Sequence, residues 1–192
     1  MRKLFIDTST DFLFVFFIED DSILFYKIQE GKNNHSEHLM EIIKEGLLKR
    51  SMKMQDFDQI YVGIGPGSYT GLRLSLTVAK MIAWTLQKDL FTFSSLDLVA
   101  SSFILQDGTY MPRIKAKKGY SYVNVINVQN QKVTVIEEDV FLSNDEVDRL
   151  QNTYKSITCD PGQTVNPVLL LKHCLYEKVE DVYAVVPRYL RG

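Results

Sequence analysis

The stretch from Tyr61 to Lys88 constrains the fold of this chain more than any other part of the sequence. Its hydrophobic pattern changes from a period of two to a period of 3.6 across a run of glycines, which predicts a buried strand, a tight turn and a long helix in direct succession. Ser68 or Thr70 can cap the first free N–H groups of that helix. Several backbone donors and the helix dipole then converge on one place, which is how many proteins hold a phosphate group. The same glycines can serve only to permit a tight turn, and this stretch alone leaves both interpretations open.

The first polar turn of the chain offers a second part for such a site. Asp7-Thr8-Ser9-Thr10 ends an expected strand over residues 2–7 and provides one carboxylate and three hydroxyl groups. These groups suit contact with Mg²⁺ or phosphate, and they are equally ordinary turn residues. The residues expected to form a phosphate or nucleotide loop are Asp7, Thr8, Gly65, Gly67, Ser68, Thr70 and Arg73.

The composition is that of a globular protein and excludes the disordered and collagen-like classes. Hydrophobic residues make up 45% and charged residues 24% of the 192 residues. A net charge of −2 argues against a chain that grips nucleic acid unaided. Cys159 and Cys174 lack metal-ligand spacing, Asp7 interrupts any signal peptide, and the apolar run 12–18 is too short to cross a bilayer. We expect a cytoplasmic protein with reduced thiols and no membrane contact.

Residues 35–49 predict an amphipathic helix. Gly46 lies in the middle of its apolar face. Since a glycine inside a helix costs about 1 kcal/mol relative to alanine, we expect another helix to approach closely there. His35 and His38 have no third ligand of suitable type near them, so no metal site is expected and they are interpreted as residues that cap and pack the helix start.

The next helix, expected over residues 70–88, has more apolar surface than packing on one sheet requires. Trp84 lies among its polar and basic residues, where it is either covered by a loop or exposed as an anchor for a partner. These features predict an interface formed by helices 35–49 and 70–88, and the alternative is a core helix sandwiched between the chain's own layers. The expected interface residues are Leu39, Ile42, Ile43, Gly46, Leu47, Leu74, Val78, Met81, Ile82 and Trp84.

The remaining pattern divides the chain at 106–108 into subdomains 1–105 and 106–192, each with strands followed by helices. In the first subdomain we expect an antiparallel meander of strands 2–7, 12–18 and 22–28, strands 58–64 and 91–93, and a helix from about 94 to 105. In the second we expect strands 110–116, 120–128, 132–138 and 155–159 and helices over about 143–151 and 164–175. Arg113, Lys115, Lys117 and Lys118 form a small basic patch that can meet RNA phosphates or simply guard a sheet edge against aggregation.

Five short motifs follow one another along the chain. They are IDTST at residues 6–10, HSE at 35–37, GIGPGSYTGLR at 63–73, SSL at 94–96 and PRYLR at 187–191. With these motifs the chain resembles the bacterial TsaB (YeaZ) family, closely over residues 1–105 and more loosely afterwards. The resemblance implies an α/β actin-like ATPase (ASKHA) fold built from two ribonuclease-H-like halves.

The resemblance also implies a role in making threonylcarbamoyladenosine in tRNA, at the adenosine beside the anticodon. In that pathway TsaB is the non-catalytic partner of the transferase TsaD, and the ATPase TsaE joins them. Family members pair through their first two helices, with TsaD or, without it, as a homodimer. Here those helices are 35–49 and 70–88. The chain is expected to have no cofactor of its own, with any ATP or ADP at the interface of the complex and tRNA reached through the complex.

One loop of the second half departs from the pattern of an active actin-like ATPase, which carries an acidic phosphate loop at this point. The chain has Lys115 where family members often have Asp, so the loop lacks an obvious Mg²⁺ ligand. This departure favours a scaffold without catalytic residues. The alternatives are an independent actin-like ATPase or kinase that uses Asp7 and the glycine turn, and a peptidase of the M22 type, for which Ser68 has no evident His and Asp partners.

Overall fold

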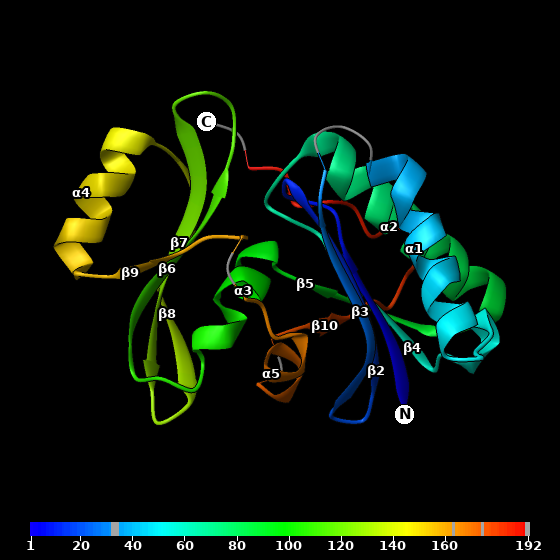
Figure 1. The fold of residues 1–192 in the computed structure, drawn as a ribbon. Helices are drawn as coiled ribbons and strands as arrows, with labels where there is room; N and C mark the ends of the chain where they lie inside the picture. The colour runs from blue at the N-terminus through cyan, green and yellow to red at the C-terminus, as the bar shows by residue number, and fades with distance from the viewer. Residues whose placement is uncertain (32–34, 163, 174, 191–192) are drawn as a thin grey trace.

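The computed structural model describes residues 1–31, 35–162, 164–173 and 175–190, apart from the side chains of residues 35–37. Layers of helices and sheets alternate through the molecule (Figure 1). The first layer holds helices α1 (His35–Lys49) and α2 (Tyr69–Leu86), and the second is a six-stranded sheet. The third layer holds the short helices α3 (Ser95–Ala100) and α5 (Pro167–Lys172). A four-stranded sheet and helix α4 (Asn144–Tyr154) form the last two layers.

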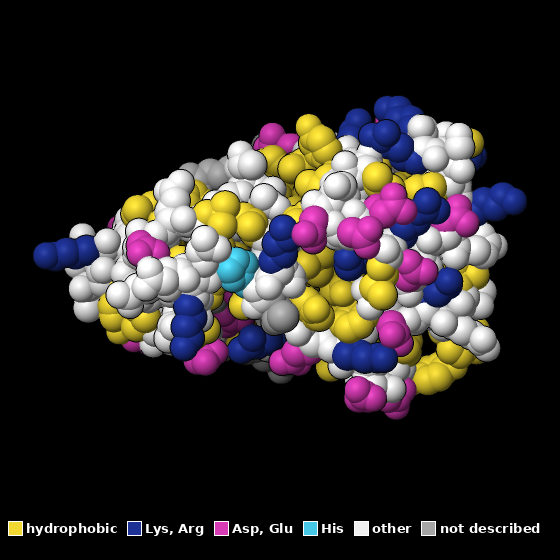
Figure 2. All heavy atoms as spheres, turned by 90° about the horizontal axis from the view of Figure 1, so that it is seen from below, with side chains coloured by type: hydrophobic (Ala, Val, Ile, Leu, Met, Phe, Trp, Pro, Cys, Tyr) yellow, Lys and Arg dark blue, Asp and Glu magenta, His cyan; other side chains and the backbone are white. Residues whose placement is uncertain are grey.

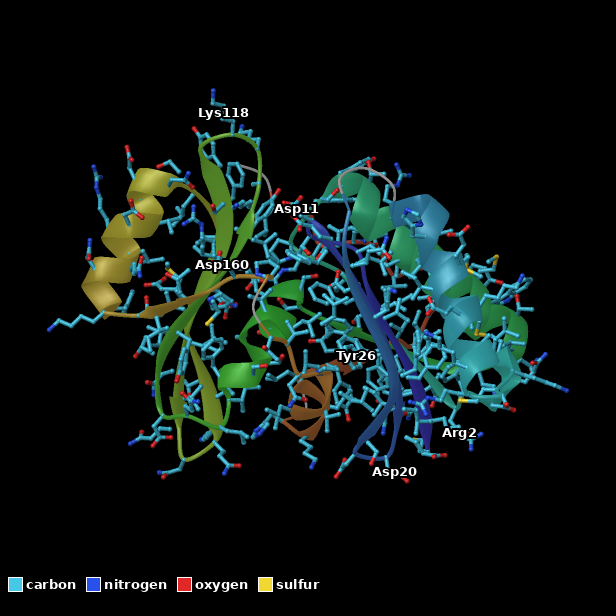
Figure 3. The ribbon with its side chains drawn as sticks, viewed as in Figure 1. Arg2, Asp11, Asp20, Tyr26, Lys118 and Asp160 are labelled. Atoms are coloured by element: carbon cyan, nitrogen blue, oxygen red, sulfur yellow. The ribbon has the colours of Figure 1, made fainter. Side chains whose placement is uncertain are left out.

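The six-stranded sheet has the order β10-β5-β4-β1-β2-β3. Its strands are β1 (Arg2–Asp7), β2 (Phe12–Glu19), β3 (Ser22–Glu30), β4 (Gln59–Gly63), β5 (Asp89–Phe93) and β10 (Glu177–Lys178). The predicted antiparallel meander is confirmed, because β2 pairs antiparallel with both β1 and β3, while β1, β4 and β5 run parallel. Both faces of β1 and β2 are buried, as expected for strands without a polar alternation, whereas Tyr26 on the edge strand β3 is exposed (Figure 3).

The four-stranded sheet repeats this topology with the order β8-β7-β6-β9. Its strands are β6 (Gly108–Lys115), β7 (Tyr120–Gln129), β8 (Lys132–Ser143) and β9 (Ile157–Cys159). Again three strands form an antiparallel meander, and the first of them then pairs in parallel with the fourth. The chain therefore has the α/β actin-like fold of two similar halves that the motifs imply.

Helix α3 connects the cores of the two halves. Its Leu98 belongs to the cluster that contains Phe5 and Phe93 of the first sheet, whereas its Val99 packs in the cluster that contains Tyr110 of the second sheet. Because one short helix buries a side chain on each side, the two sheets share a common middle layer with α5 (Figure 1).

Several predicted boundaries are wrong. The helix expected to reach about residue 105 ends at Ala100 and continues as a 3₁₀ turn, η2 (Ser101–Phe103), where the Ser101 hydroxyl donates to the Leu98 carbonyl at 2.6 Å. Helix α5 begins at Pro167 because Asn166 caps it, accepting from the N–H groups of Val168 and Leu169. Strand β8 continues to Ser143, beyond the expected residue 138.

The C-terminal residues return to the first sheet. Strand β10 pairs antiparallel with β5, and the Val179 N–H donates to the Leu90 carbonyl at 2.9 Å. The division at residue 105 stays a prediction, but residues after it clearly contribute to the first sheet as well as to the second.

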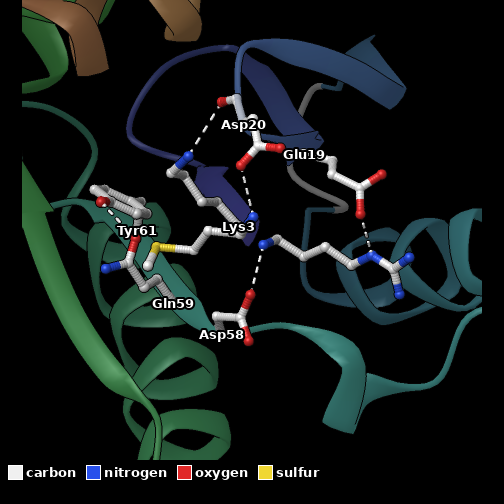
Figure 4. A network of polar contacts seen from close by, with 8 residues as sticks. Lys3, Glu19, Asp20, Asp58, Gln59 and Tyr61 are labelled. Atoms are coloured by element: carbon white, nitrogen blue, oxygen red, sulfur yellow. Dashed lines mark hydrogen bonds and ion pairs between the residues drawn. The ribbon is translucent and has the colours of Figure 1, made fainter.

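Polar contacts fix the start of β1 at the end of the sheet remote from its glycine turn (Figure 4). The terminal ammonium group pairs with the Asp20 carboxylate at 2.6 Å, and the Arg2 N–H donates to Asp58 at 2.7 Å. A further 3₁₀ turn, η1 (Met54–Asp56), leads into this region. These contacts hold β1 in register between β2 and β4.

The apolar run 12–18 is a buried strand, as predicted. Among the residues that the structure describes, no helix combines the length and the apolar character needed to cross a membrane.

Candidate functional site

A cleft of about 790 Å³ opens between the two halves. Residues 9–12, in the turn after β1, and residues 67–69, in the glycine turn, form its wall on the first half. Residues 113–117, at the end of β6 and start of the following hairpin, and residues 160–162, after β9, form its wall on the second half. Of the residues of the predicted phosphate loop, Gly67 and Ser68 belong to the first wall. The repeated topology places the corresponding loops of the second half opposite it.

The glycine turn packs directly on the turn after β1. The Ser68 N–H donates to the Ser9 carbonyl at 2.6 Å, and the Thr8 hydroxyl donates to the Gly71 carbonyl at 2.6 Å. A Cβ atom at Gly67 would overlap the Ser9 carbonyl, and one at Gly71 would overlap the Thr8 carbonyl. Close backbone approach thus explains both glycines without a ligand.

Ser68 is the N-cap of α2, and its hydroxyl accepts from the Gly71 N–H at 3.3 Å. Thr70, the other predicted cap, is exposed. The N-terminus of α2 therefore uses one of its free donors within the protein.

The residues of the predicted phosphate loop lie at different depths. Gly67 and Ser68 line the cleft, whereas Asp7 and Thr8 are buried beneath the turn, where Asp7 Oδ1 accepts from the Ser9 N–H at 2.7 Å. Gly65 faces a second cavity of about 570 Å³ instead. A nucleotide loop made of all these residues stays a prediction.

Arg73, the remaining residue of that loop, lies on the exposed surface of α2. Its guanidinium donates to the Tyr69 hydroxyl at 2.7 Å and lies 5.1 Å from the Tyr69 ring centre. Tyr69 lines the cleft, and its ring stacks with the ring of Tyr189 at 5.1 Å. Arg73 is thus placed beside the cleft through Tyr69.

The cleft carries charges of both signs. Its acidic residues are Asp11, Glu30 and Asp160, and its basic residues are Arg113, Lys115 and Lys117. Asp11 and Asp160 lie on opposite halves, and Lys118 points to solvent at the hairpin tip (Figure 3). Mixed charge also covers the face of the molecule seen from below (Figure 2). Within the described residues, no three His, Cys, Asp or Glu side chains are grouped so that they could hold a metal ion.

The basic patch of the hairpin is partly used inside the protein. Arg113 donates to Ser121 at 3.0 Å and to Asn144 at 3.1 Å. The Lys117 ammonium group lies 4.8 Å from the Tyr120 ring centre. These contacts organise the β6–β7 hairpin.

Most of the predicted interface residues face the chain's own core. Leu39, Ile42, Ile43, Val78 and Ile82 are buried in the cluster beneath α1 and α2, and Leu47 and Leu74 pack partly against it. On α2, Met81 is 54% exposed and Trp84 is 62% exposed. Met40 and Leu48, which the predicted interface does not include, are also exposed on α1.

Gly46 does not admit another helix. A Cβ atom at this position would lie 2.6 Å from the Phe17 ring and 2.7 Å from the Phe25 ring, both on the first sheet. The expectation of a close helix at Gly46 is therefore wrong, because the glycine lets α1 approach the aromatic rings of its own sheet.

The C-terminal segment adds exposed apolar groups beside α2. The Trp84 and Tyr183 rings meet edge to face at 6.2 Å, and Tyr183 and Val186 are among the most exposed apolar residues of the chain. Trp84 is therefore exposed to solvent and also contacts the C-terminal segment through Tyr183. This segment has no periodic hydrophobic pattern, so its place beside α2 was not predicted from the sequence.

The sequence matches the family model of TsaD, tRNA N6-adenosine threonylcarbamoyltransferase, over residues 29–170. It is also 35% identical over 130 residues to the tRNA threonylcarbamoyladenosine biosynthesis protein TsaB of Bacillus subtilis. The chain belongs to the TsaD family, in its TsaB (YeaZ) branch.

The likeness to individual TsaB relatives is partial in length. The match covers 68% of this chain and 57% of the Bacillus subtilis relative. With TsaB of Buchnera aphidicola subsp. Schizaphis graminum the identity is 30% over 98 residues, which are 50% of this chain and 46% of the relative. The chain thus spans about half the length of these TsaB relatives.

Two solved structures match the whole fold. A Pseudomonas aeruginosa protein described as similar to peptidase YeaZ has a TM-score of 0.81 at 19% identity, with 99% of each chain covered. YeaZ from Pseudomonas aeruginosa has a TM-score of 0.80 at 18% identity, with 98% of this chain and 99% of the other covered. At these identities the likeness concerns the fold alone, and it agrees with the two-sheet arrangement described above.

Proposed function

We propose that this chain is a non-catalytic subunit required to make threonylcarbamoyladenosine in tRNA, at the adenosine beside the anticodon, and that it binds and activates a TsaD-type transferase. The proposal is supported by the names of its TsaB relatives and by the TsaD family match. In this proposal a TsaE-type ATPase joins the complex, a homodimer forms without the transferase, and tRNA is reached through the complex. Any ATP or ADP lies at the interface.

The exposed apolar surface formed by α2 and the C-terminal segment beside it is the observation that carries this proposal. Met81, Trp84, Tyr183 and Val186 are all exposed, and we call these four side chains the α2 surface. Tryptophan and tyrosine are enriched among the residues that dominate binding energy, and a group of exposed apolar side chains is a frequent mark of a binding site. The buried residues of α1 and α2 hold this surface in place from beneath.

A Met81→Ser, Trp84→Ala double variant is expected to lose at least about 30-fold in affinity for the transferase, because truncation of an anchor residue typically costs about 2 kcal/mol or more. Affinity is measured by calorimetry with purified subunits, and the modified adenosine in tRNA is measured in cells that carry the variant. Both substituted side chains are exposed, so folding should be preserved.

Tyr26→Ser is the matched control, since it removes an exposed aromatic ring from the edge strand β3, remote from α2. It should bind the transferase normally. Substitution of Ile82 is avoided because that side chain is buried in the core and a charge there would unfold the helix. Normal binding by the Met81, Trp84 double variant would contradict the interface.

An independent ATPase or kinase is the second candidate, favoured by the size of the cleft and by the glycine turn on its wall. Calorimetry of the isolated chain with Mg-ATP distinguishes the two functions. The scaffold proposal expects no turnover by the isolated chain, with Lys115 where the resemblance leads one to expect Asp. Sub-millimolar binding with turnover would support the ATPase instead.

A further inference from the structure

The C-terminal segment 179–190 links the α2 surface to the second half of the molecule. The segment leaves β10 and packs Val179, Val182 and Val185 against the core cluster beneath α2. The Lys80 ammonium group donates to the Tyr183 carbonyl at 3.0 Å and to the Val185 carbonyl at 3.1 Å. The backbone at Tyr183 and at Val185 is therefore tied to α2.

Arg188, further along the same segment, contacts both halves at once. Its backbone N–H donates to the Ile64 carbonyl, at the end of β4, at 2.7 Å. Its guanidinium pairs with the Asp139 carboxylate, on β8, at 2.9 Å. The side chain of Asp139 is only 5% exposed, so Arg188 compensates a nearly buried charge of the second half from a segment anchored on the first.

Neighbouring groups hold the Asp139 carboxylate in place for this contact. Asn124 donates to its Oδ1 atom at 2.9 Å, and the Ser94 hydroxyl lies 3.5 Å from its Oδ2 atom. Arg188 also lines the cavity of about 570 Å³ that is bordered by the ends of β4 and β5 and by β10. The ion pair therefore joins a carboxylate held in place on the second half to a cation carried by the C-terminal segment.

We infer that residues 179–190 act as a strap, a segment that couples binding of a partner at the α2 surface to the distance between the two halves. The Arg188–Asp139 ion pair attaches this strap to the second half, and we call the pair its clasp. The inference rests on the proposed function, because it takes the transferase as the occupant. Tyr183 and Val186 would touch that partner, and Arg188 follows them on the same chain. Suppose that the partner binds the strap more tightly in one position than in another. The equilibrium between the formed and the broken Arg188–Asp139 ion pair must then shift by that difference in binding free energy.

The strap also reaches the cleft. Tyr189, next to Arg188, stacks on Tyr69, which lines the cleft wall. A change in the strap would therefore alter the cleft wall together with the spacing of the halves.

The test measures the distance between the halves directly. Spin labels are attached to cysteines introduced at Glu41, exposed on α1, and at Lys118, exposed at the hairpin tip, in a chain that carries Cys174→Ser and Cys159→Ala. Pulsed electron spin resonance then gives the distribution of inter-label distances. For the chain with an unmodified strap, we expect a distance distribution with one narrow maximum, and this maximum shifts when the transferase is added.

Arg188→Gln should broaden the distribution of inter-label distances without the transferase and abolish the shift of this distribution when the transferase binds. Asp139→Asn removes the other charge of the ion pair and should have the same two effects. Lys178→Gln is the matched control, because it removes an ion pair to Asp89 within the first sheet and should leave the distribution narrow. Thermal melts confirm that each variant is folded.

Two outcomes would overturn the coupling. One is an unchanged distribution in both clasp variants, and the other is a transferase that binds the unmodified chain without shifting the distribution. If the transferase fails to bind at all, the proposed function and the coupling both fail, while the partner-free comparison still decides whether Arg188 clasps the halves.

Discussion

Asp97→Asn is expected to make the chain more stable at pH 8 by about 2–4 kcal/mol, with little effect below pH 4. Burial first, and then the nearby Asp139 and Glu138 carboxylates, raise the pKa of the Asp97 carboxyl from 3.8 to about 7, against the opposing effect of Arg188. Although the residue keeps some exposed surface, its carboxyl group is almost enclosed by protein atoms. Asparagine removes the charge while retaining the shape.

The sign follows from proton binding. Because the folded state binds a proton at Asp97 more tightly than the unfolded state does, stability of the unmodified chain falls as the pH rises from about 4 to about 7. The Asp97→Asn variant should not show the part of this loss of stability that is due to Asp97. Urea denaturation at pH 4, 6 and 8 measures it, with Asp148→Asn, on the exposed face of α4, as control. Equal pH dependence in the Asp97 variant and the unmodified chain would contradict the assignment.

Gly71→Ala is expected to destabilise the chain by about 3 kcal/mol, by forcing α2 away from the turn after β1. Helix propensity alone predicts the opposite sign, since alanine is favoured over glycine in a helix by about 1 kcal/mol. The overlap of the new Cβ atom with the Thr8 carbonyl decides between them, because that oxygen belongs to the backbone and cannot turn aside. Denaturant titration gives the difference in the free energy of unfolding.

Gly162→Ala is the control for this prediction. A Cβ atom there would lie 3.4 Å from the Phe12 ring, an ordinary van der Waals contact, so the change should stay within about 0.5 kcal/mol. A Gly71→Ala protein as stable as the unmodified chain would show that the two turns are not held together as described.

The strand, turn and helix around Gly65–Gly71 could be predicted from the sequence because their signals are local. A change of hydrophobic period and a capping hydroxyl are both visible within a few residues. The choice between Ser68 and Thr70 as cap could not be made, since it depends on the packing of the turn after β1. Strand β10 was missed for a similar reason: two polar residues show no period, and only β5 makes them a strand.

The helical pattern of α1 and α2 identified apolar residues but not the direction in which they point. A wide apolar face is equally suited to the chain's own sheet and to a partner, and here the sheet takes Leu39, Ile43 and Val78. Trp84 was recognised because it interrupts a polar face. Tyr183 could not be placed beside it, because segments far apart in the sequence meet only through the tertiary fold.

The pairing of β10 with β5 has a consequence for the synthesis of the chain. The first sheet cannot gain this edge strand until residues 177–178 leave the ribosome, long after β5 has been made. At about 5–20 residues per second, β5 waits for several seconds with an unpaired edge. During that interval the nascent chain should be most sensitive to chaperones and to aggregation through this edge.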